Sequence, residues 1–141
     1  MDNKTQVVKH LEMIQGVINR LGHDSFIIKG WSVAILSAGI IFIARGEGQS
    51  KMVVIALLIP VIGFWILDGY FLRQERLFRE VYNEIRKQGC TDFAMDTKKH
   101  EDKPDCSRRA SIFSRTLSIF YVIIEGIFVL AVFVILNFWD S

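Results

Sequence analysis

The sequence predicts an all-α integral membrane protein with three transmembrane helices. Apolar runs lie at residues 26–44 and 52–72 and within 108–136, and each is long enough to cross a hydrocarbon core of ~30 Å as a helix. Of the 141 residues, 51% are hydrophobic, which is high for a small soluble protein. A chain of this length forms one domain at most, so residues 1–141 are expected to make a single membrane domain.

The distribution of positive charge predicts an orientation with the amino terminus inside and the carboxyl terminus outside. Fifteen of the seventeen Lys and Arg residues lie before the first run ends or between the second and third runs. Only Arg45 and Lys51 lie in the short loop after the first run. Because Lys and Arg gather on the cytoplasmic side of membrane proteins, both basic regions are expected there. The mixed polar segment before residue 26 is not a secretory signal peptide, so we expect the amino terminus to be retained.

Residues 5–21 are predicted to form an amphipathic helix. Gly22 is placed to end this helix, and Asp24 or Ser25 to cap the next one. Its apolar side chains could pack on another helix, pack on copies of the same helix in an oligomer, or rest on the lipid surface. The apolar positions alternate steps of four and three: Val7, Leu11, Ile14, Ile18 and Leu21.

The second run is predicted to continue beyond the membrane as a cytosolic helix to residue 88, because an apolar stripe persists beyond Asp68 and Gly89 then supplies a stop. Residues 90–107 are polar and predict a mobile cytosolic loop. Its two cysteines lie in a reducing compartment, and their spacing from His100 fits no zinc pattern, so neither a disulfide nor a metal site is expected. Ser107 is expected to cap a last helix over residues 108–136.

The first run carries two features that point to helix packing. Gly30, Ala34 and Ala38 recur at four-residue steps and favour close approach of another helix. Lys29 and Asp68 lie at similar depth near the cytosolic ends of their runs, which favours an ion pair between the first two spans. The alternative is that Lys29 extends to the interface and stays unpaired.

Glu125 is the most informative single residue, because it interrupts 21 otherwise uncharged residues. It lies ten residues beyond Arg115, or about 15 Å into the hydrocarbon layer. Acids at this depth are costly and are commonly functional. The face that carries Glu125 is polar on the cytosolic side, with Tyr121, Ser118, Ser114 and Ser111, and apolar on the outer side, with Phe128, Val132 and Ile135.

Two interpretations of this face stay open. In the first, copies of the helix surround a pore in which Ser114, Ser118 and Tyr121 line a wet vestibule, Glu125 forms a ring, and Phe128 and Val132 form an apolar gate. In the second, the polar side chains bond to the first two spans of the same chain. A protonated Glu125 bonded to a neighbouring helix belongs to the second.

The sequence offers no support for an enzyme or for a bound cofactor. It has no glycine-rich phosphate loop, serine nucleophile elbow or zinc-binding helix motif, and no His lies within a span. The basic cytosolic region could instead bind a multivalent anion such as a nucleotide or oligonucleotide. Charge bias and anionic lipid headgroups are the competing explanation of the same side chains. The candidate ligand residues are Arg73, Arg76, Arg79, Arg86, Lys87, Arg108 and Arg109.

Three segments carry a resemblance to known proteins: HLEMIQGVINRL (10–21), SFIIKGWSV (25–33) and WILDGYFLRQERLFREVY (65–82). They resemble a widespread group of short bacterial membrane proteins. The layout of a spanning hairpin that runs into a cytosolic helix is similar to SLATT-type membrane effectors of anti-phage systems, and to the membrane component of the Hailong system. SLATT proteins usually have two spans, so the third span is the departure. The resemblance implies a bacterial inner-membrane channel, gated by a nucleotide-derived ligand that a partner enzyme makes.

These observations together predict a homo-oligomer in the lipid bilayer, with a tetramer favoured, that conducts ions or depolarises the membrane. A cytosolic ligand or partner is expected to control it. The alternative is a non-conducting scaffold whose amino-terminal helix and cytosolic extension recruit a soluble partner. A transporter is less favoured because the chain has no internal inverted repeat.

Overall fold

The computed structural model describes residues 2–46 and 51–139, and this part of the chain contains helices and no strand. Three of the helices are long and apolar enough to cross a membrane. The short loop expected around Gly48 falls outside the described residues. The elements, in chain order, are α1 (Asn3–Ala44), α2 (Lys51–Gln88), the 3₁₀ helices η1 (Lys98–His100) and η2 (Pro104–Cys106), α3 (Arg108–Ile112) and α4 (Arg115–Trp139).

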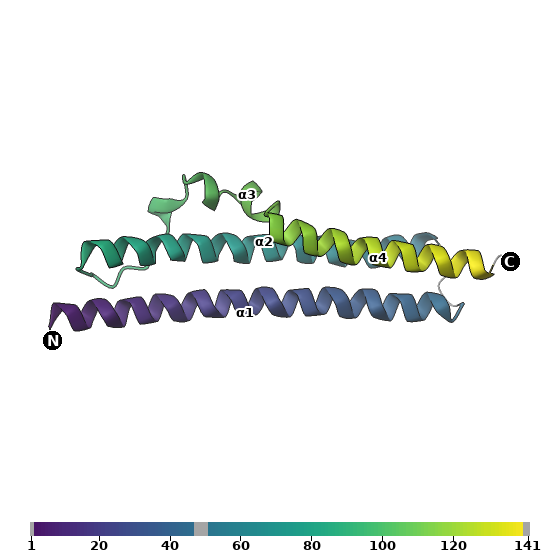
Figure 1. The fold of residues 1–141 in the computed structure, drawn as a ribbon, viewed down its shortest axis with the longest axis horizontal. Coiled ribbons are helices and arrows are strands. Elements are labelled where there is room, and N and C mark those ends of the chain that lie inside the picture. Colours follow the sequence, from purple (N-terminus) through teal and green to yellow (C-terminus); the bar gives the residue numbers. More distant parts are fainter. Residues whose placement is uncertain (1, 47–50, 140–141) are drawn as a thin grey trace.

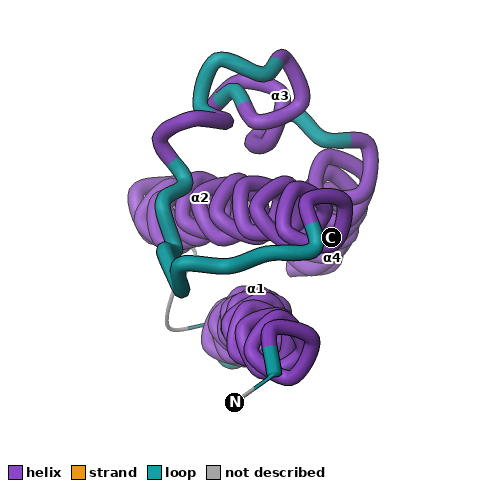
Figure 2. The backbone as a smooth tube through the Cα atoms, turned by 90° about the vertical axis from the view of Figure 1, so that its left-hand side faces the viewer, coloured by secondary structure: helices purple, strands orange, loops and turns teal. Residues whose placement is uncertain are grey.

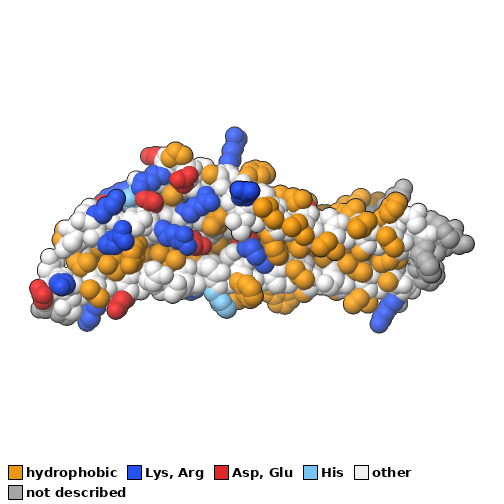
Figure 3. Space-filling view, in the orientation of Figure 1, with side chains coloured by type: hydrophobic (Ala, Val, Ile, Leu, Met, Phe, Trp, Pro, Cys, Tyr) orange, Lys and Arg blue, Asp and Glu red, His pale blue; other side chains and the backbone are white. Residues whose placement is uncertain are grey.

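The molecule is a long antiparallel pair of helices with different partners at its two ends. α1 and α2 lie side by side along almost their whole length (Figure 1). α4 packs along one half of this pair. In the other half, the loop after α2 first passes beside α1, and its later part and α3 then cover the side of α2 away from α1 (Figure 2). Charged side chains gather over the half with the loop, and apolar side chains dominate the half with α4 (Figure 3). We call these the polar half and the apolar half.

α1 is one uninterrupted helix, which corrects the prediction of two helices separated at Gly22. A glycine inside a helix costs only about 1 kcal/mol relative to alanine, and packing against α2 on both sides of this point outweighs that cost. Ser25 does not cap a helix, because its hydroxyl donates a hydrogen bond to Asp68. The amphipathic segment therefore continues the line of the first apolar run as part of the same helix.

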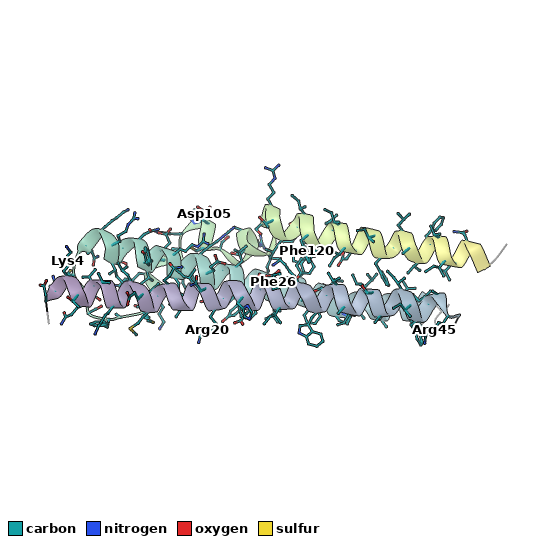
Figure 4. All side chains as sticks on the ribbon, turned by 60° about the horizontal axis from the view of Figure 1, so that its bottom comes forward. Lys4, Arg20, Phe26, Arg45, Asp105 and Phe120 are labelled. Atoms are coloured by element: carbon teal, nitrogen blue, oxygen red, sulfur yellow. The ribbon has the colours of Figure 1, made fainter. Side chains whose placement is uncertain are left out.

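Two separate apolar clusters hold the long pair together. In the polar half, the predicted seam of α1 meets the extension of α2, and Ile14 and Ile18 bury against Val81 and Ile85. In the apolar half, α1, α2 and α4 share a larger cluster, whose buried members are Leu36, Ile43, Val61, Leu117, Tyr121, Phe128 and Val132. Figure 4 shows Lys4 and Arg45 near the two ends of α1, which contacts both clusters.

The last helix is broken, which corrects the prediction of a continuous helix over 108–136. Ser107 caps α3 by accepting a hydrogen bond from the backbone of Ala110 at 3.1 Å, and the helix ends at Ile112. The chain turns, and the Ser114 hydroxyl accepts a hydrogen bond from Leu117 N at 3.4 Å to start α4. Short polar side chains can bond to nearby backbone groups, so a series of serines that looks helical by its spacing can instead start two helices. Here Ser107 starts α3 and Ser114 starts α4.

The loop over residues 90–107, here called the strap, is ordered against α2, contrary to the expectation of a mobile loop. Arg73 Nε donates to the carbonyl of Cys106 at 2.9 Å, and Arg76 Nη1 donates to that of Asp105 at 2.7 Å. Lys103 pairs with Glu80 on α2. Cys106 is consequently buried. The polar composition of the strap reflects bonds to charged side chains on α2 rather than freedom from structure.

Candidate functional site

A cluster of polar side chains joins the three long helices at the boundary between the two halves. We call it the polar hub and define it as Ser25, Lys29, Asp68 and Tyr121. Asp68 on α2 is fully buried and forms an ion pair with Lys29 of α1, whose side chain is 21% exposed. Ser25 donates to the same carboxylate, and Lys29 Nζ donates to Ser25 Oγ at 2.7 Å. The structure thus joins the two residues that the sequence suggested as a pair.

Tyr121 brings α4 into the hub. Its hydroxyl donates to Asp68 Oδ2 at 3.3 Å, and its ring stacks on Trp65 with centroids 5.6 Å apart. Lys29 also lies 5.8 Å from the ring centre of Phe120, which Figure 4 labels on α4. Each charge in the hub has a partner, so the hub balances charge and fixes the register of the helices.

The face of α4 that was expected to line a pore packs inside the chain. Tyr121, Phe128 and Val132 are buried against α1 and α2, and Ser114 is buried at the start of α4. Ser118 on the same face is partly buried. Tyr121, Phe128, Val132 and Ser114 therefore pack within the single chain and are not free to line a pore, whereas Ser118, like Glu125, stays partly exposed.

Glu125 lies at the edge of this packed face and is partly exposed. Its Oε1 is buried and has no hydrogen-bond partner among the residues that the structure describes. The carboxyl group borders an open groove of about 490 Å³ on the outer surface of α4. The other residues lining the groove are Val122, Gly126, Val129, Leu130 and Phe133. One carboxylate oxygen of Glu125 therefore lies without a hydrogen-bond partner among the described residues, in a side chain that borders an apolar surface groove.

The basic residues proposed as one ligand site are dispersed and partly used within the chain. Arg73 and Arg76 hold the strap, and Arg79 pairs with Glu75 at 2.5 Å. Arg86, Lys87, Arg108 and Arg109 are exposed. Arg73 lies beside Arg108, and Arg86 follows thirteen positions later on α2. The two exposed groups are therefore ~20 Å apart along the helix. No single basic pocket gathers the set of seven.

The charge pairs that hold the strap shift the pKa values of their members. The hydrogen bond from Lys103 lowers the pKa of Glu80, and the same bond raises the pKa of Lys103. Burial raises the pKa of the Cys106 thiol. The strap is therefore fixed by groups that are ionised near neutral pH, while its buried cysteine stays in the thiol form.

Two histidines also attach the strap to the helices, and neither was identified as a functional residue from the sequence. His100 Nε2 lies 3.0 Å from Glu84 Oε2, and buried His10 of α1 bonds through Nδ1 to Thr91. Phe93 lies against the His10 ring, with centroids 5.4 Å apart. These partners lie 16 and 81 residues apart in the chain, so neither a motif nor a helical period links them.

The described residues hold no group of three or more His, Cys, Asp or Glu side chains placed to bind a metal ion. The site is thus a charge-balanced hub in the interior, an unpartnered acid on the surface of α4, and a strap fastened to α2. No family model, curated protein or solved structure matches the chain, so these contacts are the basis for any functional assignment.

Proposed function

We propose that the protein is a homo-oligomeric, ion-conducting membrane effector in which Glu125 faces an axis shared by several copies. The observation that carries the proposal is the position of Glu125, about 15 Å into the apolar half, with one carboxylate oxygen unpartnered among the described residues. A carboxylate facing lipid is costly, whereas a ring of carboxylates around water is a common basis of cation pathways. A position on the shared axis would place the Glu125 carboxylate in water and out of contact with lipid.

The neighbouring copy is proposed to pack its α1 against Gly126, along one margin of the groove, so that Glu125 is left facing the axis. The Gly30, Ala34 and Ala38 stripe is exposed, and helices can approach such a stripe closely. A pocket between α1 and α4 joins Ser37 to Ile124 and Ile127, which puts the stripe at the depth of Glu125. Each contact joins α1 of one copy to α4 of the next, so the two sides of the interface are different surfaces and the arrangement is head to tail. We propose that this arrangement closes into a ring, and we favour a tetramer.

The polar half is proposed to control conduction. The strap is tied to α2, and α2 continues into the apolar half without a break, so a ligand or partner that moves the strap acts on a continuous helix. The resemblance to anti-phage effectors favours a nucleotide-type ligand from a partner enzyme. Two separate groups of exposed cations are available to such a ligand, Arg86 with Lys87 at the end of α2 and Arg108 with Arg109 at the start of α3.

The scaffold alternative has less support from the contacts. It relied on the amino-terminal helix and the cytosolic extension of α2 to recruit a soluble partner, but Ile14 and Ile18 of the first are buried against Val81 and Ile85 of the second. A partner helix cannot reach these side chains unless α1 and α2 separate.

A pair of glycine substitutions tests the assembly. Both glycines are exposed, and a Cβ at Gly126 or at Gly63 would meet no atom within 4 Å, so a side chain added at either position leads into open space. Gly126→Leu fills the groove and should reduce the oligomer to monomers in detergent, while Gly63→Leu on α2 should leave it intact. The measurement is mass by light scattering with the detergent contribution removed. A monomeric wild type, or equal effects of the two changes, would contradict the proposed contact.

A second pair tests conduction. Glu125→Gln keeps the size of the side chain and should lower cation flux into liposomes while the oligomer persists, because the ring loses its charge. Ile123→Ala, on the exposed lipid-facing side of α4, is the control and should conduct as the wild type does. Unchanged flux in Glu125→Gln would overturn the pore. So would an oligomer that does not conduct even when Arg76→Ala has released the strap and Glu125 is intact.

A further inference from the structure

A pocket of about 280 Å³ lies where α3 meets α2, apart from the polar hub and the groove beside Glu125. Gly69 allows α3 to approach this closely, since a Cβ there would lie 2.8 Å from the Cα of Ile112. Trp65 Nε1 holds the end of α3 in place by donating to the carbonyl of Ile112 at 2.9 Å. The pocket is lined by Ile66, Gly69, Tyr70, Arg73, Arg108 and Ile112.

The cationic side of the pocket has unused hydrogen-bond donors. Arg108 is exposed and has no hydrogen-bond or ion-pair partner among residues 2–46 and 51–139. Arg73 uses Nε on the Cys106 carbonyl, and its 3.7 Å contact with the exposed Glu101 is too long for a strong hydrogen bond. Two guanidinium groups beside one pocket present the planar donor pattern that fits phosphate oxygens.

The other side of the pocket is apolar and lies at the edge of the apolar half. Ile66 and Tyr70 are each about half exposed, at 54% and 53%, one helical turn apart. Arg73 follows one turn later, so the lining changes from aliphatic to aromatic to cationic over ~10 Å along α2. This is the order in which a phospholipid at a membrane boundary presents its chain, its glycerol region and its phosphate. A soluble anion would use only the last of these.

We propose that this pocket binds the phosphate group of an anionic phospholipid, with Arg108 and Arg73 on the phosphate and Ile66 and Ile112 against the first part of an acyl chain. The ligand chemistry is a phosphate ester, which a soluble phosphate shares, and the apolar lining favours the lipid. The site does not depend on conduction or on the number of copies. A lipid here fastens α3, and through it the end of the strap, to the membrane surface.

The test uses the full chain in detergent, with short-chain phosphatidylglycerol as the probe, phosphatidylcholine as the uncharged comparison and glycerol phosphate as the headgroup without a chain. Bound lipid is counted by native mass spectrometry over a titration. Arg108→Ala is compared with Arg109→Ala, which removes the same charge from the adjacent exposed residue outside the pocket. Both side chains are exposed, so both variants should fold.

Wild type should bind a first phosphatidylglycerol in preference to phosphatidylcholine. Arg108→Ala should weaken that binding about tenfold, the size of one charge-assisted contact, whereas Arg109→Ala should stay near wild type. Equal weakening in both variants, or no preference for phosphatidylglycerol, would overturn the site, since general attraction to positive charge would then explain the binding. Binding of glycerol phosphate as tightly as phosphatidylglycerol would overturn the lipid as its occupant.

Discussion

Asp68 is the residue on which the three long helices converge. It is fully buried and accepts hydrogen bonds from Ser25 and Lys29 of α1 and from Tyr121 of α4. A carboxylate in this position is tolerated because a nearby cation and two hydroxyl groups replace the water that it loses. The hub therefore contributes more to the choice of one helix arrangement than to net stability.

We expect Asp68→Ala to lower the free energy of unfolding by about 3 kcal/mol, because it leaves Lys29 largely buried without a counter-charge. Tyr121→Phe removes one of the hydrogen bonds that Asp68 accepts, while those from Ser25 and Lys29 remain. This change should lower the free energy of unfolding by about 1 kcal/mol. The paired change Lys29→Met with Asp68→Leu should recover most of the loss. Unfolding in mixed detergent micelles measures all three, and an Asp68→Ala protein as stable as Tyr121→Phe would contradict the role of the ion pair.

The strap is the element whose structure depends most on charge. It contains no long helix, and it is held by arginine donors to backbone carbonyls and by the Lys103 and Glu80 pair. Exposed pairs of this kind are individually weak, so the strap should open at lower free energy than the two apolar clusters. This makes it the natural place for a ligand or partner to act.

The strap should loosen in acid. The folded pKa of Glu80 is below its ordinary value of 4.5, so its pair with Lys103 stabilises the strap above pH 4.5 and that contribution is lost as pH falls through the lowered pKa. The raised pKa of Lys103 sets the other limit, because its contribution is present below pH 10.5 and is lost above it.

Hydrogen exchange measures this change at the amides of Cys106 and Ser107, which bond to Lys103 and Pro104 within the strap. Their protection factors, corrected for intrinsic exchange, should fall below pH 4.5. In Glu80→Gln the protection should be lower at neutral pH and should change less in acid. If protection in Glu80→Gln falls in acid as much as in the wild type, another carboxyl group is responsible for the loss of protection.

The whole molecule is a rod with chemically different ends. α1 contributes to both apolar clusters, so the polar half and the apolar half are linked by a continuous helix as well as by α2. The far end of the apolar half carries few cations, of which Arg45 is one, whereas most cations of the described residues lie in the polar half (Figure 3). This asymmetry is the basis of the proposed orientation.

Labelling with a membrane-impermeant maleimide tests that orientation. Native Cys90 is exposed in the polar half and should react only after the cells are permeabilised. Arg45→Cys in a Cys90→Ser background should react in intact cells, because the loop beside it is expected outside. The reverse pattern would place the polar half outside and would remove the argument for a cytosolic ligand.

Sequence reasoning succeeded where a local pattern determines a local structure. Long apolar runs require helices in a bilayer because every backbone polar group must bond within its own segment, and the three apolar helices follow from this. Local signals failed at Gly22 and in the strap. At Gly22 a helix stop was overruled by packing with α2, and in the strap a polar composition concealed bonds to partners 16 to 33 residues away.

The sequence by itself determined the three apolar helices, the uneven distribution of cations and the presence of an acid in the last span, because each is a property of composition along one segment. Only the tertiary structure decided which face of α4 turns inward. Helical periodicity groups Tyr121 and Phe128 with Glu125 but cannot say what that face meets. Contact with α1 and α2 buries the first two and leaves Glu125 at the edge, because Asp68 provides a partner for Tyr121 and the single chain provides none for Glu125 among the described residues.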